Sequence, residues 1–337
     1  MSANADATRA PQLRERLRPL VAGSRAGLWV AVGLVVMFGF HALHPSSQLI
    51  YLAISIAIFA VAASGLALLY GDCGLLSVAH GGIVGLGAYT TIMALAYGFS
   101  ELETFFCAIA FGVVAAVLIG GPSLRLQGHY YVVTTFAAAE TMGVVASNLG
   151  WLGGTAGKSL PYKPSFLRTE SGLYYSSFVT LIIVICLLVM LRRAPFGGKL
   201  IAIRENETLA RSLGVRTKRF KVATFAFSGG ICGLAGFFFA FANQYVSPQD
   251  VGSAPGIALV MILILGGSRH WLGPIVGAVV YYGLPYIFPL SALQNQLAIG
   301  VLLIAVILVL PQGLVGAAQG MRRHASERLL PRLREAK

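Results

Sequence analysis

Long runs of apolar residues, separated by short polar or charged breaks, cover most of this chain. A run of about 17–25 apolar residues is what an α-helix needs to cross the hydrocarbon of a bilayer. The pattern predicts ten helical segments, most of them of this length: 27–43, 49–70, 81–99, 104–121, 129–149, 174–191, 220–242, 256–267, 271–288 and 293–310. The eighth is too short to span alone at about 1.5 Å per residue. It either extends into the residues before it or forms a half-helix covered by protein.

The composition agrees with a chain whose solvent is lipid. Of the 337 residues, 57% are hydrophobic and 11% are charged, whereas soluble domains carry about 25% charged residues. This excludes a soluble enzyme, a disordered protein and a nucleic-acid-binding domain. We therefore expect an all-α integral membrane protein with about ten transmembrane helices, surrounded by membrane lipid and without a nucleic-acid partner. The four cysteines show no metal-ligand spacing, and we expect no metal or other cofactor.

The net charge of +13 predicts orientation, because Lys and Arg are retained on the cytoplasmic side of a membrane. With the N-terminus in the cytoplasm, 21 of the 25 Lys and Arg residues fall in inward-facing stretches. We expect a basic cytoplasmic tail at 1–26, a transmembrane domain at 27–311 and a second basic cytoplasmic tail at 312–337. Within the transmembrane domain, 192–219 is the largest inner loop and 150–173 is the long outer loop.

The largest inner loop combines dense charge with a helical pattern over residues 203–215. Leu209 and Leu213 are four residues apart and share one face of this predicted helix. Glu205 and Glu207 fall in its first turn, where the helix dipole favours negative charge, and Gly214 follows it as a C-terminal cap would. The pattern predicts a short amphipathic helix. It is either a solvated connector or a docking surface for a cytoplasmic partner.

Glycines suggest where helices pack and where one is interrupted. Small-residue pairs at a spacing of four let helix backbones approach closely, and they predict a compact multi-helix body. Residues 71–82 interrupt two apolar runs at an inner turn and include Ser77 and His80. Unwound backbone between helix halves is a common lining of a translocation route, but an ordinary polar turn fits the same pattern. The glycine pairs are Gly81 and Gly85, Gly229 and Gly233, and Gly273 and Gly277.

Glu140 is the only acidic residue within the ten segments, and Thr134 and Thr135 precede it in the fifth. A carboxylate at that depth is costly, so we expect it to face the interior of the protein. It either makes a structural hydrogen bond between helices or lines the solute path or its gate. No second buried acid, Lys or Arg accompanies it, which argues against a proton-relay pump.

The sequence contains no convincing motif for catalysis or nucleotide hydrolysis. Gly153-Gly-Thr-Ala-Gly-Lys-Ser159 is not a P-loop, because the pattern G-x-x-x-x-G-K-[ST] needs glycine where Leu152 stands and no strand precedes it. No H-E-x-x-H, G-x-S-x-G or Cys/His ligand cluster occurs either. We therefore expect a transport subunit rather than an enzyme. It is a passive pore, uses an ion gradient, or depends on ATP hydrolysis by another subunit.

Seven short motifs follow one another along residues 49–316: Gly74-Leu-Leu-Ser-Val-Ala-His-Gly-Gly with Gly85-Leu-Gly-Ala-Tyr89; Tyr130 to Glu140; Gly153-Gly-Thr-Ala-Gly; Ala202-Ile-Arg-Glu-Asn-Glu207 with Leu213-Gly-Val215; Tyr245-Val-Ser-Pro248; Gly266-Gly-Ser-Arg-His-Trp-Leu-Gly-Pro274; and Leu310-Pro-Gln-Gly-Leu-Val315. In this order and spacing they resemble the permeases of bacterial ABC importers for branched-chain amino acids. The resemblance is strongest to the longer, M-type permease of the leucine/isoleucine/valine system.

The resemblance implies the cobalamin-type (type II) ABC importer permease fold, placed in the bacterial inner membrane with both termini cytoplasmic. It also implies that residues 204–215 form the coupling helix that docks on a cytoplasmic ATPase. The residues expected at this contact are Arg204, Glu205, Glu207, Leu209, Arg211, Leu213 and Gly214. The candidates for the solute path or gate are Ser77, His80, Thr134 and Glu140.

Permeases of this family pair with a second, shorter permease, two ATP-binding subunits and a periplasmic solute-binding protein. The resemblance therefore implies ATP-driven uptake by alternating access. Gly81, Gly82 and Ile83 stand where family members often have alanines followed by phenylalanine. Urea, short amides or another small solute are thus alternatives to branched-chain amino acids. A stand-alone secondary transporter or channel is the alternative class, and a membrane-embedded enzyme is disfavoured because no clustered His, Asp or Glu lies at a helix end.

Overall fold

The computed structural model describes residues 38–39, 45–126, 128–161, 166–167, 169–288, 291–310 and 312–319. The chain divides into two units, Met1–Ser47 and Gln48–Lys337. The predicted N-terminal tail lies outside the described residues, as do most of segment 27–43 and most of the C-terminal tail. The second unit contains the helices and strands that surround the candidate functional residues.

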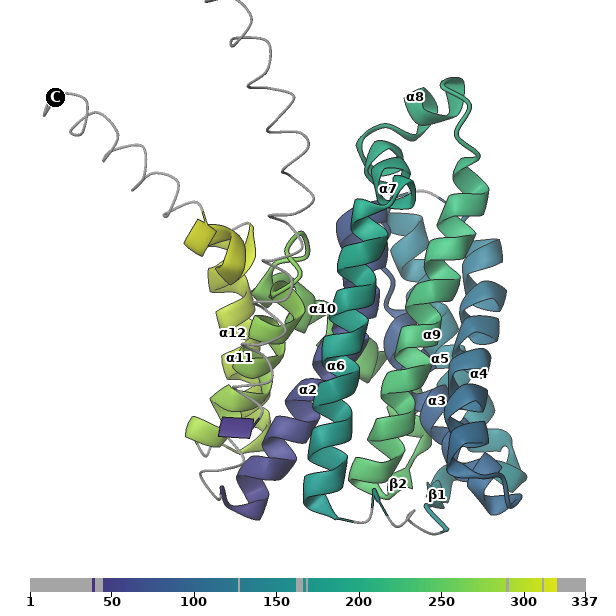
Figure 1. The fold of residues 1–337 in the computed structure, drawn as a ribbon, viewed down its shortest axis with the longest axis vertical. Coiled ribbons are helices and arrows are strands. Elements are labelled where there is room, and N and C mark those ends of the chain that lie inside the picture. The colour runs from purple at the N-terminus through teal and green to yellow at the C-terminus, as the bar shows by residue number, and fades with distance from the viewer. Residues whose placement is uncertain are drawn as a thin grey trace, which may run out of the picture. The chain divides into compact units, whose positions relative to one another are not determined.

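Each of the nine later predicted segments corresponds to one helix (Figure 1). Apolar runs form helices here because a helix satisfies its own backbone hydrogen bonds in lipid. The inner loop adds two short helices, α7 (Pro195–Glu205) and α8 (Glu207–Ser212). The others are α2 (Ser47–Ala67, continued by a π-helical turn at Leu68–Asp72), α3 (Ala79–Ala96), α4 (Glu101–Ser123), α5 (His129–Asn148), α6 (Glu170–Arg193), α9 (Thr217–Asn243), α10 (Ser253–Gly266), α11 (Gly273–Ile287) and α12 (Ala292–Val309).

Helix length gives a smaller number of membrane crossings than expected. Among the described residues, six helices are long and apolar enough to cross a membrane, or seven if α5 and the turns after its 88° bend form one span. α10 and α11 have 14 and 15 residues, fewer than a straight crossing needs. The predicted shortness of the eighth segment is confirmed. The predicted count of ten crossings is not. The chain is a multi-pass membrane protein, and its described residues are all-helical apart from one short strand pair.

Local sequence determines where several helices begin. Ser100 and Glu103 form a capping box at α4, in which the Glu103 carboxylate accepts a hydrogen bond from the Ser100 N–H at 2.8 Å. Ser291 and Gln294 form the same motif at α12, and the Thr169 hydroxyl caps α6. These side chains satisfy N–H groups that have no partner in the first helical turn.

α9 packs along α3 and α4, and glycines allow the close approach. Gly229 and Gly233 of α9 lie against Gly112 of α4, so that a Cβ at any of the three would collide with the neighbouring helix. Gly81 and Gly85 of α3 lie equally close to the backbone at and before the start of α10. Gly273 and Gly277 of α11 lie equally close to the carbonyls of Gly267 and Ile262, so all three predicted pairs are confirmed as sites of close backbone packing.

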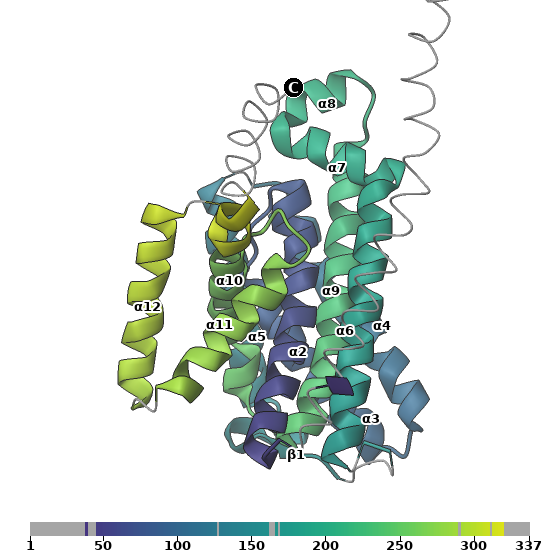
Figure 2. The ribbon, with the colours of Figure 1, turned by 60° about the vertical axis from the view of Figure 1, so that its left-hand side comes forward.

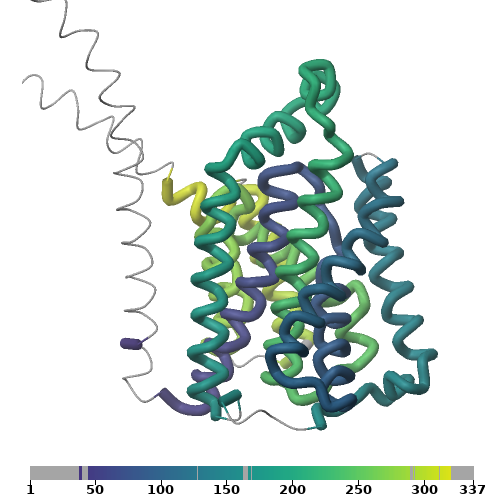
Figure 3. The backbone as a smooth tube through the Cα atoms, turned by 45° about the vertical axis from the view of Figure 1, so that its right-hand side comes forward, coloured from purple at the N-terminus to yellow at the C-terminus, as the bar shows by residue number. Residues whose placement is uncertain are grey.

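The two ends of the second unit differ. α7 and α8 project at one end (Figure 3), while strands β1 (Lys158–Ser159) and β2 (Tyr245–Val246) pair antiparallel at the other (Figure 1). The segment that superficially resembles a P-loop forms short 3-10 turns, Gly150–Leu152 and Gly154–Ala156, and then β1. α11 and α12 pack beside α10 on one side (Figure 2).

Candidate functional site

The inner-loop helix predicted over residues 203–215 is broken at Asn206. α7 ends at Glu205, Asn206 has an extended backbone (φ −157°, ψ 100°), and α8 begins at Glu207. The Asn206 side-chain oxygen accepts a hydrogen bond from the Leu209 N–H at 2.9 Å, and Asn is among the preferred N-cap residues. The prediction of one continuous helix over residues 203–215 is therefore wrong.

Two exposed leucines lie at the projecting end of the second unit, Leu209 in α8 and Leu213 as its C-cap residue. The side chains of Leu209 and Leu213 are 57% and 76% exposed, whereas Ala210 between them is buried. Gly214 follows with φ of +85°, a conformation that favours glycine, and its N–H donates to the Arg211 carbonyl at 3.0 Å. Leu209 and Leu213 are thus large apolar side chains that a short helix, capped at both ends, leaves exposed.

Ion pairs connect α8 to α9. The Glu207 carboxylate lies 2.6 Å from the Lys221 ammonium and 3.3 Å from the Arg211 guanidinium. Partial burial alone would raise the pKa of Glu207, but the hydrogen bond and charge of Lys221 outweigh it and hold the pKa below its usual value. The carboxylate is therefore ionised at neutral pH and fixes the orientation of α8. Glu205 makes only a looser pair with Arg204, at 3.7 Å.

A small basic pocket lies beside α8. Its volume is about 230 Å³. A concave site with an excess of positive charge attracts anionic groups, and Glu207 offsets only part of that charge. The pocket is lined by Leu124, Arg125, Glu207, Arg211, Lys218 and Lys221.

Two arginines connect the inner loop to the end of α2. The Arg204 guanidinium donates to the Gly71 carbonyl, and a Cβ at Gly74 would contact the Arg204 side chain. Arg192, at the end of α6, pairs with Asp72 at 2.6 Å. The inner loop is thus attached to the residues that lead into the unwound stretch 74–78.

Residues 74–78 have no helical structure, which both interpretations of this glycine-rich stretch predict. The stretch enters the protein, where Ser77 and His80 are fully buried. The Val78 N–H donates to the Thr135 hydroxyl at 3.2 Å, and the His80 ring lies 4.9 Å from the ring of Phe225. Neither the Ser77 hydroxyl nor the His80 ring makes a hydrogen bond of ordinary geometry to the described residues. In this conformation neither candidate path residue is accessible from the surface.

Glu140 does not face the interior, contrary to the prediction. Its side chain lies on the exposed face of α5 and accepts hydrogen bonds from the Ser253 hydroxyl and, at 3.2 Å, from the Ser253 N–H. Ser253 is the first residue of α10, so the carboxylate caps a helix N-terminus, where the dipole favours negative charge. Thr134 is half-buried and donates to the Tyr130 carbonyl at 2.8 Å. Glu140 thus forms a hydrogen bond between α5 and α10, whereas the Thr134 hydroxyl bonds within α5.

Several of these contacts were not predicted from the sequence. Asn206 carried a usable signal, because Asn inside a helical pattern is a favoured N-cap. The Asp72–Arg192 and Glu140–Ser253 contacts carried none, since 120 and 113 residues separate the partners. Among the described residues, no group of three or more His, Cys, Asp or Glu side chains could hold a metal ion.

The chain is similar to known transport proteins over most of its length. Residues 48–311 match the family described as branched-chain amino acid transport system / permease component. Over 289 residues the chain is 28% identical to LivM, a high-affinity branched-chain amino acid transport system permease protein of Escherichia coli K12, covering 77% of this chain and 68% of that protein.

A second type of relative is an import permease for a different solute. Over 213 residues the chain is 28% identical to the autoinducer 2 import system permease protein LsrC of Yersinia pestis, covering 60% of this chain and 59% of LsrC. No solved structure matches the chain. The relatives are transport subunits rather than enzymes. Because the family match covers more than half of its length, this chain belongs to the family of branched-chain amino acid transport system permease components.

Proposed function

We propose that this permease moves branched-chain amino acids inward across the bacterial inner membrane as one subunit of an ATP-driven importer. The observation that carries the proposal, together with family membership, is the pair of exposed leucines on α8. The complete importer contains a second, shorter permease, two cytoplasmic ATP-binding subunits and a periplasmic solute-binding protein. Its permease fold is of the cobalamin type, with ten helical segments and both termini in the cytoplasm.

The α8 end faces the cytoplasm in this proposal. Arg204, Arg211, Arg216, Lys218 and Arg219 all belong to the loop at that end, and basic residues are retained on the cytoplasmic side of bacterial membranes. Leu209 and Leu213 then enter an apolar groove of the ATPase. The basic pocket beside α8 receives an acidic side chain from the rim of that groove.

Movement of α8 reaches the membrane domain through named contacts. Glu207 ties α8 to Lys221 of α9, and Arg204 ties α7 to the Gly71 carbonyl. A shift of the inner loop therefore pulls on the residues before the unwound stretch 74–78. That stretch bends more readily than a helix, because few of its backbone groups are bonded within a regular element. Such a shift would change the buried positions of Ser77 and His80.

The solute path runs along the exposed face of α5, between this chain and the second permease. Glu140 lies on that face. A carboxylate that pointed into hydrocarbon would cost about 2.5–3.5 kcal/mol. A protein interface or a water-filled path removes most of that cost. Thr134 lies along the same helix and contributes a half-buried hydroxyl.

Branched-chain amino acids are the preferred solutes because residues 48–311 match the corresponding family and LivM is similar over most of this chain. The unusual glycines near His80 do not favour another solute. Gly81 lies against the backbone of Pro255 and Gly256, and Gly82 lies against the Val251 carbonyl. Their lack of a side chain is thus explained by helix packing.

The test is uptake of radiolabelled leucine by cells that lack their own branched-chain amino acid importers. These cells express the chain together with an ATPase, a second permease and a binding protein from the same organism. We expect uptake that unlabelled isoleucine and valine reduce, that urea and acetamide do not reduce, and that ceases when the ATPase is inactivated. Uptake that persists without the ATPase would instead identify a stand-alone transporter.

A further inference from the structure

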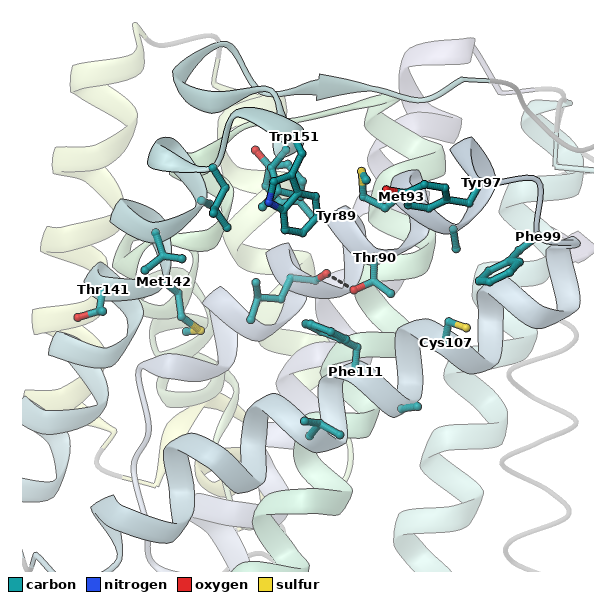
Figure 4. A pocket seen from close by; sticks show the side chains of 18 residues that line it. Tyr89, Thr90, Met93, Tyr97, Phe99, Cys107, Phe111, Thr141, Met142 and Trp151 are labelled. Atoms are coloured by element: carbon teal, nitrogen blue, oxygen red, sulfur yellow. Dashed lines mark hydrogen bonds between the residues drawn. The ribbon is translucent and has the colours of Figure 1, made fainter.

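An apolar cavity of about 690 Å³ lies between α3, α4 and α5 (Figure 4). It is next to Lys158 of β1, at the end of the second unit opposite α8 (Figure 1). Its walls include Met93, Phe111 and Trp151. The volume is within the range of roughly 300–1,000 Å³ that is typical of small-molecule sites. The hydroxyl of Thr90, one of its few polar groups, already donates to the Leu86 carbonyl at 2.8 Å. The cavity is therefore suited to a long apolar group.

The α3 and α4 walls of the cavity have the composition of a membrane-facing surface. α3 and α4 are both candidate membrane spans, and α4 carries no charged residue after Glu103. Phe111 and Val114 of α4 line the cavity and are about half exposed. Tyr97 and Trp151, at the ends of α3 and α5, are exposed as well. Aromatic side chains of this kind are enriched at the boundary between membrane and water.

One cation lies at the rim of this cavity. The Lys158 ammonium is 3.1 Å from the Trp151 carbonyl oxygen and 3.2 Å from the Met93 sulfur, and both residues belong to the cavity wall. The pairing of β1 with β2, in which Lys158 is opposite Val246, fixes this position. None of the ion pairs formed by the described residues includes Lys158.

We propose that this cavity binds an anionic phospholipid, with an acyl chain inside it and the phosphate beside Lys158. The site combines what such a molecule needs: an apolar volume at membrane depth and a cation at the membrane boundary. A free amino acid is a poor match, because its ammonium group would find no acidic residue in the wall. The second permease belongs on the Glu140 side of α5 in the proposed importer. The cavity is also lined by the exposed Phe111 and Val114 of α4, whose uncharged outer face is typical of a surface in contact with lipid.

The test uses the full-length chain in phosphatidylcholine nanodiscs that contain increasing fractions of phosphatidylglycerol with brominated acyl chains. Bromine quenches tryptophan fluorescence on contact. The chain has three tryptophans, so Trp29→Phe and Trp271→Phe leave Trp151, in the cavity wall, as the only reporter. We expect quenching that saturates at a low fraction of brominated phosphatidylglycerol. Brominated phosphatidylcholine should quench less at the same fraction.

Two pairs of variants separate the headgroup from the acyl chain. Lys158→Gln should weaken the preference for phosphatidylglycerol about fivefold, as expected for the attraction of one lysine near an anionic membrane, and Lys158→Arg should keep it. Ala110→Phe, which fills the cavity, should abolish the saturable phase. Leu118→Phe, on the same helix and outside the cavity, should not.

Three outcomes would overturn the proposal. Quenching that rises in proportion to the lipid fraction and is equal for both headgroups means that ordinary bulk lipid fills the cavity. An absence of quenching means that protein covers it. Saturable quenching that Lys158→Gln leaves unchanged means that the headgroup is not recognised by this residue.

Discussion

Replacing Leu213 with Asp is the sharpest test of how this permease connects to an ATPase. The Leu213 side chain is 76% exposed, so docking can bury about three quarters of it. Full burial of a leucine contributes about 1.5–3 kcal/mol, which makes this share about 1–2 kcal/mol. An aspartate in the same groove adds about 1–3 kcal/mol for a desolvated group without a partner. A total near 3 kcal/mol corresponds to an affinity loss on the order of a hundredfold.

The fold should not change, because an exposed substitution away from special contacts usually alters the free energy of unfolding by less than about 0.5 kcal/mol. The measurement is the dissociation constant between the purified full-length permease and its fluorescently labelled ATPase, together with leucine uptake in cells. Ser212→Asp is the matched control, since it places the same charge one residue earlier on the exposed surface of α8. We expect Leu213→Asp to lose ATPase binding and uptake, and Ser212→Asp to keep most of both.

The reasoning is refuted if Leu213→Asp binds the ATPase as tightly as the unmodified chain at a normal level in the membrane. Equal losses in Leu213→Asp and Ser212→Asp would also contradict it. That result would mean that negative charge, and not the apolar contact, determines binding.

Three further predictions concern the Glu140 cap of α10, the orientation of the chain in the membrane, and the charge that holds α8. Glu140→Gln should fold and yield normally, whereas Glu140→Leu should lose about 1 kcal/mol of stability in thermal unfolding, because it removes the cap of α10. Near-normal leucine uptake by Glu140→Gln fits a structural role. Reduced uptake by this variant at normal protein yield fits a role in the solute path. Single cysteines at Thr169 and Arg216, both exposed, should react with an impermeant reagent only from outside and only from inside, respectively; labelling from one side would contradict the orientation. The pKa of Glu207 is lowered in the folded chain, so its stabilisation of α8 is complete above the usual pKa of a glutamate and is lost as pH falls through the lower folded value. Hydrogen exchange in α8 should therefore accelerate at acid pH in the unmodified chain. In Glu207→Gln, exchange corrected for intrinsic rates should be independent of pH in this range.

The sequence predicted features that depend on local composition. Each apolar run from residue 49 onward became a helix, because in lipid the helix is the way for such a run to satisfy its backbone. The shortness of α10 and the close packing at Gly229 and Gly233 also followed from the sequence, since length and side-chain size are properties of the residues themselves. The family motifs were recognisable for the same reason.

Tertiary structure decided which residues meet. Glu140 is the only acid within its segments, yet only the packing of α5 beside α10 showed that it caps Ser253 and lies on the exposed face. The break at Asn206 is local, because the Asn206 side chain caps α8, but only the packed structure showed that α7 bonds to the Gly71 carbonyl and α8 to Lys221. Lys158 was one charge in an outer loop until β1 placed it beside the cavity. Hydrophobic pattern fixes the helices, because each one needs only its own residues, whereas pairs more than a hundred residues apart exist only once those helices have packed.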